Sequence, residues 1–146
     1  MKKLLALVAV SVVGYFGWTH FAADSPAVTA YRSFARAWAY QSYDAARDLT
    51  LEGSPARKMV DDRIDLRKKG GFPGATMSIN ALSFSILSEI ASDGGRLVTL
   101  RAQQSIRVSG MGGESAFGRP GLDEHVVTLE AKGATWKITS FTEKQL

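Results

Sequence analysis

The sequence contains no cysteine among its 146 residues. Disulfide cross-links, thiolate metal sites and cysteine nucleophiles are therefore excluded. Histidine is nearly as scarce, with two residues in the sequence. His20 lies in a hydrophobic stretch, and His125 lies far along the chain. A site built on several histidines has no basis in such a sequence. We accordingly predict neither a metal nor a cofactor.

A large excess of charge of one sign is also missing. The chain has 18 Lys and Arg against 14 Asp and Glu, and two of the cations, Lys2 and Lys3, precede a hydrophobic run. The dense basic patch of Arg63 and residues 67–69 suits the last turn of a helix, where cations offset the helix dipole. We therefore expect no nucleic-acid partner. With 45% hydrophobic and 22% charged residues, the remainder is typical of one folded domain.

One long hydrophobic run is present, in residues 4–23, which carry no formal charge at neutral pH. As a helix rising ~1.5 Å per residue, this run would span about 30 Å, the thickness of the hydrocarbon core. The lysines before it favour a cytoplasmic N-terminus, and the aromatic residues near its end suit the opposite headgroup layer. We predict a bilayer anchor in residues 1–24 and an extracytoplasmic domain in residues 25–146 of a single-pass inner-membrane protein. The anchor residues are Leu4, Leu5, Val8, Val12, Tyr15, Phe16 and Trp18.

A cleaved secretory signal peptide is the competing interpretation of the same segment. Signal peptidase sites need small residues, but cleavage after Ala23 would place the bulky Phe21 close before the cut, and cleavage after Ala22 would do the same with His20. We favour a retained anchor. Both interpretations export the domain.

Helix signals open the domain. Ser25-Pro26 and Ser54-Pro55 each place an N-cap serine before a proline at the first helical position. The first helix continues with an apolar stripe at helical spacing, and a short helix starting at Tyr43 ends by Gly53. The third helix closes at residues 67–69, before two glycines. The stripe of the first helix consists of Tyr31, Phe34, Ala35, Trp38 and Ala39.

Strand signals follow from residue 76 onward, where apolar residues alternate with polar ones. The first strand is expected to be bulged near Leu82, where the alternation shifts phase. A second strand begins at Leu97, a glycine-rich loop covers residues 110–121, and a closing hairpin turns at Gly133. Helices followed by a strand meander predict an α+β domain with helices packed on a four-stranded antiparallel sheet.

Two local patterns resemble the NTF2-like superfamily, a cone-shaped α+β fold. AYRSFARAWAYQSYDAARDLT is similar to its aromatic helix and following short helix, and HVVTLEAKGATWKITSFTE to its final hairpin. The resemblance implies a curved sheet with a pocket beneath the first helix, lined here by Tyr31, Phe34, Trp38 and Trp136. Because this fold hosts enzymes, binders and scaffolds, it assigns no function by itself.

The enzymes of this superfamily use an aspartate base with a tyrosine and a second acid, or a histidine–aspartate pair. Neither set maps onto this sequence, so we assign no catalytic residue and favour a protein that is not an enzyme. The acids on the third helix are better explained as a solvated face, and Tyr31, with Trp38 in the same stripe, as core or cavity lining. The residues considered were Tyr31, Tyr40, Tyr43, Asp61, Asp62, Asp65, Glu89, Asp123, Glu124 and His125.

The layout of a short basic tail, one crossing and an exported domain is similar to that of VirB8-like secretion components. We therefore expect a non-catalytic envelope protein that binds another envelope protein or itself. The sheet face and the glycine-rich loop, with Met111 and Phe117, would contact the partner. Two alternatives stay open: a small apolar ligand in the cone pocket, with a possible enzymatic role, and an envelope immunity or inhibitor protein.

Overall fold

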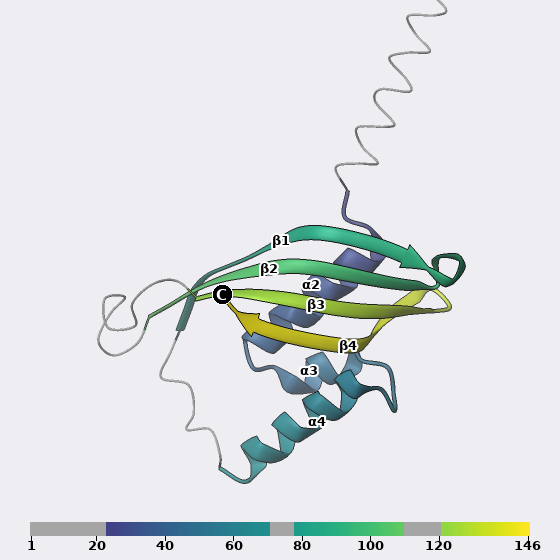
Figure 1. Ribbon diagram of the computed structural model, residues 1–146. Helices are drawn as coiled ribbons and strands as arrows, with labels where there is room; N and C mark the ends of the chain where they lie inside the picture. Colours follow the sequence, from purple (N-terminus) through teal and green to yellow (C-terminus); the bar gives the residue numbers. More distant parts are fainter. Residues whose placement is uncertain (1–22, 71–77, 110–120) are drawn as a thin grey trace, which may run out of the picture.

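The computed structural model describes residues 23–70, 78–109 and 121–146. Three helices come first within these residues, followed by four strands (Figure 1). The predicted α+β class, with helices preceding an antiparallel sheet, is confirmed. The elements are α2 (Pro26–Ala39), α3 (Tyr43–Asp48), α4 (Pro55–Lys68), β1 (Ser78–Ser92), the 3-10 turn η1 (Asp93–Gly95), β2 (Leu97–Ser109), β3 (Gly121–Lys132) and β4 (Thr135–Gln145).

Both predicted helix starts are confirmed, and each rests on a serine cap. The Ser25 hydroxyl accepts from the backbone N–H of Val28, and the Ser54 hydroxyl accepts in the same way from Arg57. A proline follows each cap, where its missing N–H leaves no bond unmade. These local signals determine where the helix layer begins.

The sheet is a meander in the order β1-β2-β3-β4, and every neighbouring pair is antiparallel. A bulge was predicted near Leu82, and the register does shift nearby, between Ile79 and Ala81, whereas Leu82 itself pairs with Ile106. A second shift, which the sequence did not indicate, lies between Ile86 and Ser88. A bulge sets two residues of one strand against one residue of its neighbour, so its position depends on the strand beside it as well as on the local alternation.

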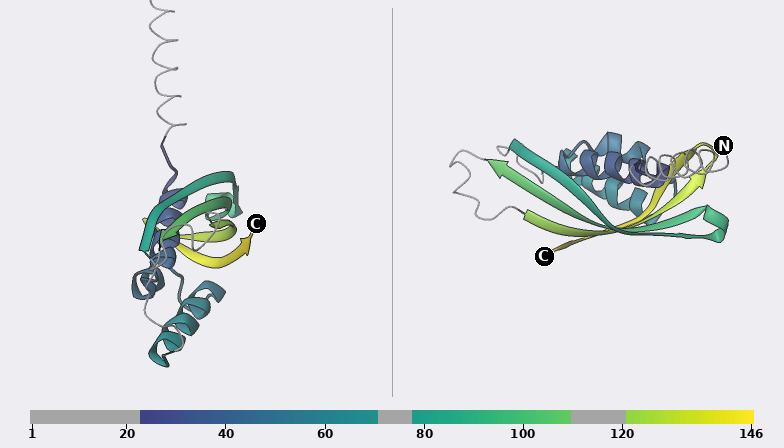
Figure 2. Two further views of the ribbon diagram at one scale, coloured as in Figure 1. Left: turned by 90° about the vertical axis from the view of Figure 1, so that its left-hand side faces the viewer. Right: turned by 90° about the horizontal axis from the view of Figure 1, so that it is seen from above.

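All described helices lie on one side of the twisted sheet (Figure 2). Helix α2 lies across the inner face, and α3 and α4 follow on the β4 side (Figure 1). The segment between α3 and α4 is joined to β4 by two backbone bonds, from Leu51 N–H to the Ile138 carbonyl and from Ile138 N–H to the Leu49 carbonyl. The opposite, outer face of the sheet carries no described helix.

The core lies between α2 and the inner face of β2, β3 and β4. Alternate residues of each strand point inward and are buried, as expected for a sheet covered on one side. The inward residues that pack with the α2 stripe are Val98, Leu100, Ala102, Val127, Leu129, Ile138 and Phe141.

The predicted membrane anchor falls almost entirely outside the described residues. Within residues 23–70, 78–109 and 121–146, no helix is both long and apolar enough to cross a membrane. The anchor therefore stays a prediction.

Candidate functional site

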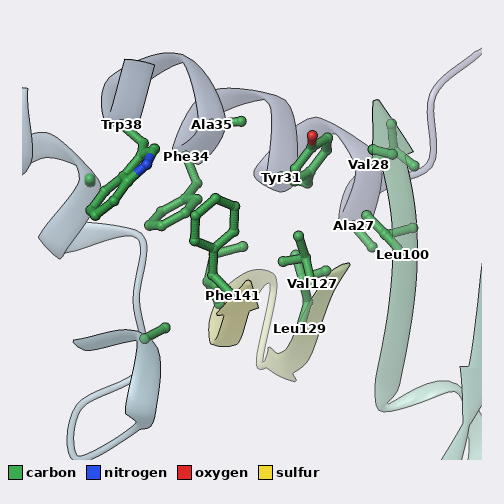
Figure 3. Packing of buried hydrophobic residues seen from close by; sticks show 14 of the residues in the cluster. Ala27, Val28, Tyr31, Phe34, Ala35, Trp38, Leu100, Val127, Leu129 and Phe141 are labelled. Carbon is green, nitrogen blue, oxygen red and sulfur yellow. The ribbon is translucent and has the colours of Figure 1, made fainter. Parts of the chain in front are cut away.

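Three of the four residues predicted to line a pocket pack together beneath α2. Tyr31 and Phe34 have no exposed surface, and Trp38 is 9% exposed. The rings of Phe34 and Trp38 stack with centroids 6.2 Å apart, and Phe141 meets both edge-on at 5.1 and 5.7 Å (Figure 3). Trp136 lies elsewhere on β4, close to the turn after β3, and is partly buried against the core. The three aromatic side chains of α2 thus occupy the space under the helix as core.

A fully buried histidine lies beside this cluster. His125 comes from β3, and its Nδ1 lies 2.8 Å from the Tyr31 hydroxyl oxygen. Its Nε2 lies 3.3 Å from Oε1 of Glu143, on the neighbouring strand. The other oxygen of Glu143 accepts from the indole N–H of Trp38 at 3.5 Å. Four side chains from α2, β3 and β4 therefore form one hydrogen-bonded chain.

The environment of this hydrogen-bonded network determines which of its groups donate and which accept. Burial raises the pKa of Tyr31 well above its usual range, so the phenol keeps its proton and donates to Nδ1 of His125. With Nδ1 accepting from Tyr31, Nε2 of the His125 ring is the nitrogen that donates to Glu143. The hydrogen bond from His125 holds the pKa of Glu143 below its usual value, against the opposing effect of burial. Glu143 is thus an ionised acceptor at the partly exposed end of the chain.

The hydrogen bonds among Tyr31, His125 and Glu143 limit the chemistry that these three side chains can perform. Each ring nitrogen of His125 has a partner, and the Tyr31 hydroxyl bonds to one of them. A general base must be free to take a proton from a substrate within hydrogen-bond reach. Together these groups join α2 to β3 and β4, and a buried polar network of this kind favours one packing of the core.

The next polar pair on the inner face is less well satisfied. Asp123 and Gln104 lie opposite each other on β3 and β2, toward the end of the sheet where β2 finishes and β3 starts. Burial, and then the charge of Glu143, raise the pKa of Asp123. Gln104 is only 3% exposed, and no described residue donates to its Oε1.

The remaining sequence candidates have plainer surroundings. Asp61 pairs with Arg47 at 2.6 Å on the surface, Glu89 accepts from Ser25, and Glu124 pairs with Arg101 at 2.7 Å. Tyr43 is buried in the core, whereas Tyr40 is 52% exposed, and Asp62 and Asp65 are exposed as well. No group of acids and histidines in the described part of the chain is arranged to hold a metal ion.

Sequence reasoning considered His125 but missed Glu143. The signal for the first was available, because His125, Val127 and Leu129 alternate along β3 and all three are buried. Glu143 stands two residues after the inward Phe141, which places it on the same face of β4. The pairing of His125 with Tyr31 joins residues 94 positions apart, and no local pattern encodes it.

A second candidate site is the outer sheet surface, the face of the sheet away from the helices. Ile90 is 62% exposed there, Leu122 40% and Val126 38%. The nearest charged pair, Arg101 and Glu124, is joined by an ion pair on the same face. We define the outer sheet surface as Ile90, Thr99, Arg101, Leu122, Glu124, Val126, Thr128 and Thr142.

The loop residues predicted to touch a partner, Met111 and Phe117, lie outside the described residues. Their role stays a prediction.

The chain resembles solved structures in fold, whereas no protein-family model and no curated protein sequence matches it. A ketosteroid isomerase-like protein from Erwinia carotovora atroseptica matches with a TM-score of 0.54 at 10% identity, over 81% of this chain and 92% of that one. A calcium/calmodulin-dependent protein kinase type II association domain from Thiobacillus denitrificans matches with a TM-score of 0.54 at 14% identity, over 80% and 92%.

A third structure, Bdellovibrio bacteriovorus Bd1075, gives a TM-score of 0.48 at 11% identity over 79% of this chain, which spans only 38% of that protein. The matches to the Erwinia and Thiobacillus structures show an NTF2-like fold, as the helix and hairpin patterns predicted. At such low identity the likeness concerns the fold alone.

Proposed function

We propose that this chain is a non-catalytic, membrane-held assembly protein whose outer sheet surface binds a second copy of the same chain. The observation that carries the proposal is the outer sheet surface itself, where Ile90, Leu122 and Val126 are exposed on a face without a described helix. An antiparallel sheet can leave one face in water, but that face is then usually polar. Three large apolar side chains on it favour a packed partner.

The chemistry of the surface favours a second copy over a strongly charged partner. Around the apolar residues stand threonines, and Arg101 is already neutralised by Glu124. Two such faces can pack together as the sheets of a β-sandwich do, about 10 Å apart. A two-fold axis then places the same residues on both sides of the contact.

The inner face supports the non-catalytic part of the proposal. The aromatic side chains expected to line a pocket are packed as core, and His125 has a partner on each ring nitrogen. A substrate would have to displace Tyr31 or Glu143 before it could reach the histidine.

Sedimentation of the full-length chain in a mild detergent tests the assembly. We expect a concentration-dependent dimer that Leu122→Arg shifts toward monomer, because two-fold packing would bury both new charges. Leu66→Arg is the matched control, since Leu66 is a similarly exposed leucine that lies on α4 and not on the outer sheet surface. A wild-type monomer at every concentration, or equal effects of the two variants, would contradict the proposal.

We also propose that residues 4–23 hold this domain at the extracytoplasmic side of the inner membrane. Only one residue, Asp24, separates that run from the Ser25 cap, so the domain would lie close against the membrane surface. After an alkaline wash of membranes, the full chain should stay in the pellet, and a chain starting at Ala23 behind a cleavable export signal should be released. Release of the full chain would refute the anchor.

A second candidate function, small-ligand binding at the polar end of the inner face, is favoured by one observation. The buried Gln104 Oε1 accepts no hydrogen bond from a described residue and lies beside Asp123. A ligand with an N–H or O–H donor would satisfy it. A thermal-shift screen of such small molecules should find compounds that stabilise the wild type but not Gln104→Leu. No hit, or equal shifts for both proteins, would remove this candidate.

A further inference from the structure

An open hollow of about 510 Å³ lies on α2 and α3, on the side of α2 away from the core. Its size falls within the range of small-molecule sites. Its lining includes the charged residues Asp24, Arg32 and Arg36 and the hydroxyl-bearing residues Tyr40 and Ser42. None of its lining residues belongs to the outer sheet surface. None belongs to the hydrogen-bonded network of Tyr31, His125, Glu143 and Trp38 either.

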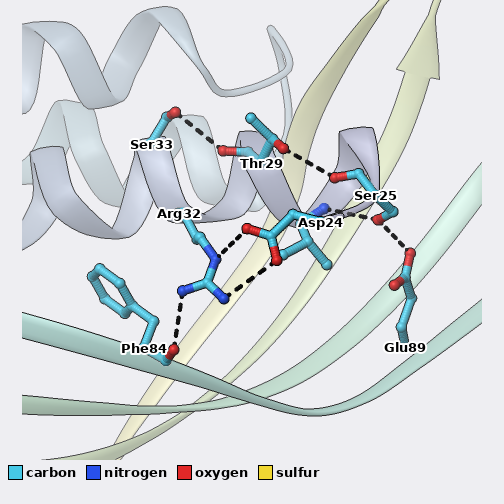
Figure 4. A network of polar contacts seen from close by, with 8 residues as sticks. Asp24, Ser25, Thr29, Arg32, Ser33, Phe84 and Glu89 are labelled. Carbon is cyan, nitrogen blue, oxygen red and sulfur yellow. Dashed lines mark hydrogen bonds and ion pairs between the residues drawn. The ribbon is translucent and has the colours of Figure 1, made fainter. Parts of the chain in front are cut away.

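Arg32 is held in place by the structure around it (Figure 4). Its guanidinium donates to the Phe84 carbonyl at 3.0 Å and pairs with Asp24 across 2.8 Å. The Nε–H is nevertheless buried and not aligned with an acceptor, so the short contact to Asp24 is an ion pair and not a well-formed hydrogen bond. Arg32 is therefore a fixed cation at the edge of the hollow.

Arg36 lies one helical turn after Arg32 and also lines the hollow. It makes no hydrogen bond or ion pair with any described residue, and its side chain is exposed. Two like charges at this spacing repel one another on a helix. Asp24 is the single acid among the described residues of the lining and already faces Arg32, so one of the two arginine charges has no described acid in the hollow to offset it.

The uncharged part of the lining completes the site. Tyr40 and Ser42 each bring a hydroxyl group to the hollow, and hydroxyls can donate to an anion. Ala37 and Ala45 add small apolar surface, against which the body of an organic ligand could rest. Planar guanidinium groups donate two parallel hydrogen bonds to phosphate oxygens, which makes arginine well suited to bind them.

We propose that this hollow binds the phosphate group of a phosphate ester, with Arg36 as its main ligand and Arg32 as the second cation. A bound phosphate would remove the repulsion between the two arginines. The ester has two possible sources, a soluble phosphate monoester or the headgroup of an anionic phospholipid. The second source rests on the proposed anchor, which places Asp24 next to the membrane surface.

The test uses the full-length chain in lipid nanodiscs and glycerol 3-phosphate as the probe, titrated calorimetrically at low salt. In phosphatidylcholine discs we expect saturable binding by the wild type. Arg36→Gln should weaken it about tenfold or more, the effect of losing a charged hydrogen-bonding group. Arg47→Gln is the matched control, because Arg47 is an exposed arginine on α3 that pairs with Asp61 and does not line the hollow.

Discs that contain phosphatidylglycerol distinguish the two sources. If the headgroup occupies the hollow, the apparent affinity for glycerol 3-phosphate falls in these discs, and it falls much less for Arg36→Gln. If the affinity is the same in both kinds of disc, the site takes a soluble ester, and the phosphate site itself is still supported. Absence of saturable binding in phosphatidylcholine discs, or equal binding by wild type and Arg36→Gln, overturns the proposal.

Discussion

Tyr31→Phe removes one hydroxyl from a fully buried side chain and leaves Nδ1 of His125 without a donor. A buried polar atom that loses its partner destabilises the fold by about 1–3 kcal/mol. His125→Leu produces the converse defect, since the Tyr31 hydroxyl then has no acceptor and Glu143 loses a donor. Each single variant should therefore lower the free energy of unfolding by a sizeable part of the ~5–15 kcal/mol available to a domain.

The double variant, Tyr31→Phe with His125→Leu, distinguishes this network from simple packing. Replacing both partners by apolar groups removes the hydroxyl and the ring nitrogen together. This lowers the free energy of unfolding far less than leaving either group buried without a hydrogen bond. The double variant should therefore be more stable than the sum of the singles predicts, by about 1–2 kcal/mol, a coupling typical of groups in one hydrogen-bond network.

Urea unfolding of the three variants and the wild type, all as full-length chains in the same detergent, measures this coupling. Tryptophan fluorescence is a suitable probe, because Trp38 lies in the same cluster. Free energies that add within about 0.5 kcal/mol would refute the reasoning, since independent sites behave in that way.

Three further predictions concern single groups. The pKa of Glu143 is lowered in the folded state, so ionised Glu143 stabilises the fold above its unfolded pKa, and this stabilisation is lost as the pH falls. Glu143→Gln should therefore flatten the acid limb of a plot of melting temperature against pH. The pKa of Asp123 is raised, so the charged carboxylate opposes folding near neutral pH. Asp123→Asn should therefore raise the melting temperature at neutral pH, and this increase should vanish in acid. Loss of the cap hydroxyl in Ser54→Ala should destabilise the domain by about 0.5–2 kcal/mol in urea unfolding, with a smaller loss for Ser54→Gly.

The parts of the fold that the sequence predicted are those with local causes. Ser25 and Ser54 identify two helix starts because a cap and a proline act on the residues next to them. Alternation along β3 and β4 identifies strands because every second side chain faces the core. One bulge was predicted, near Leu82, and the shift between Ile86 and Ser88 was not, since the position of a bulge also depends on the neighbouring strand.

The candidate site was predictable only in part. The aromatic stripe of α2 was evident from its helical spacing, but whether Phe34 and Trp38 line a cavity or fill it depends on Phe141, which comes more than one hundred residues later. The link from Tyr31 to His125 likewise joins distant elements, so a single sequence contains no sign of it. The exposed apolar residues of the outer sheet surface became evident only once the register showed which face each side chain occupies.

The absence of native cysteine allows the most direct test of assembly through the outer sheet surface. A single spin label can be attached at Val126→Cys, near the centre of that surface, or at Leu66→Cys on α4. Inter-copy distances are then measured by dipolar spectroscopy on the full-length chain in detergent. Face-to-face pairing of the sheets predicts a short distance between labels at position 126 and a clearly longer one at position 66. No coupling between labels at position 126, or a shorter distance at position 66, would contradict the account.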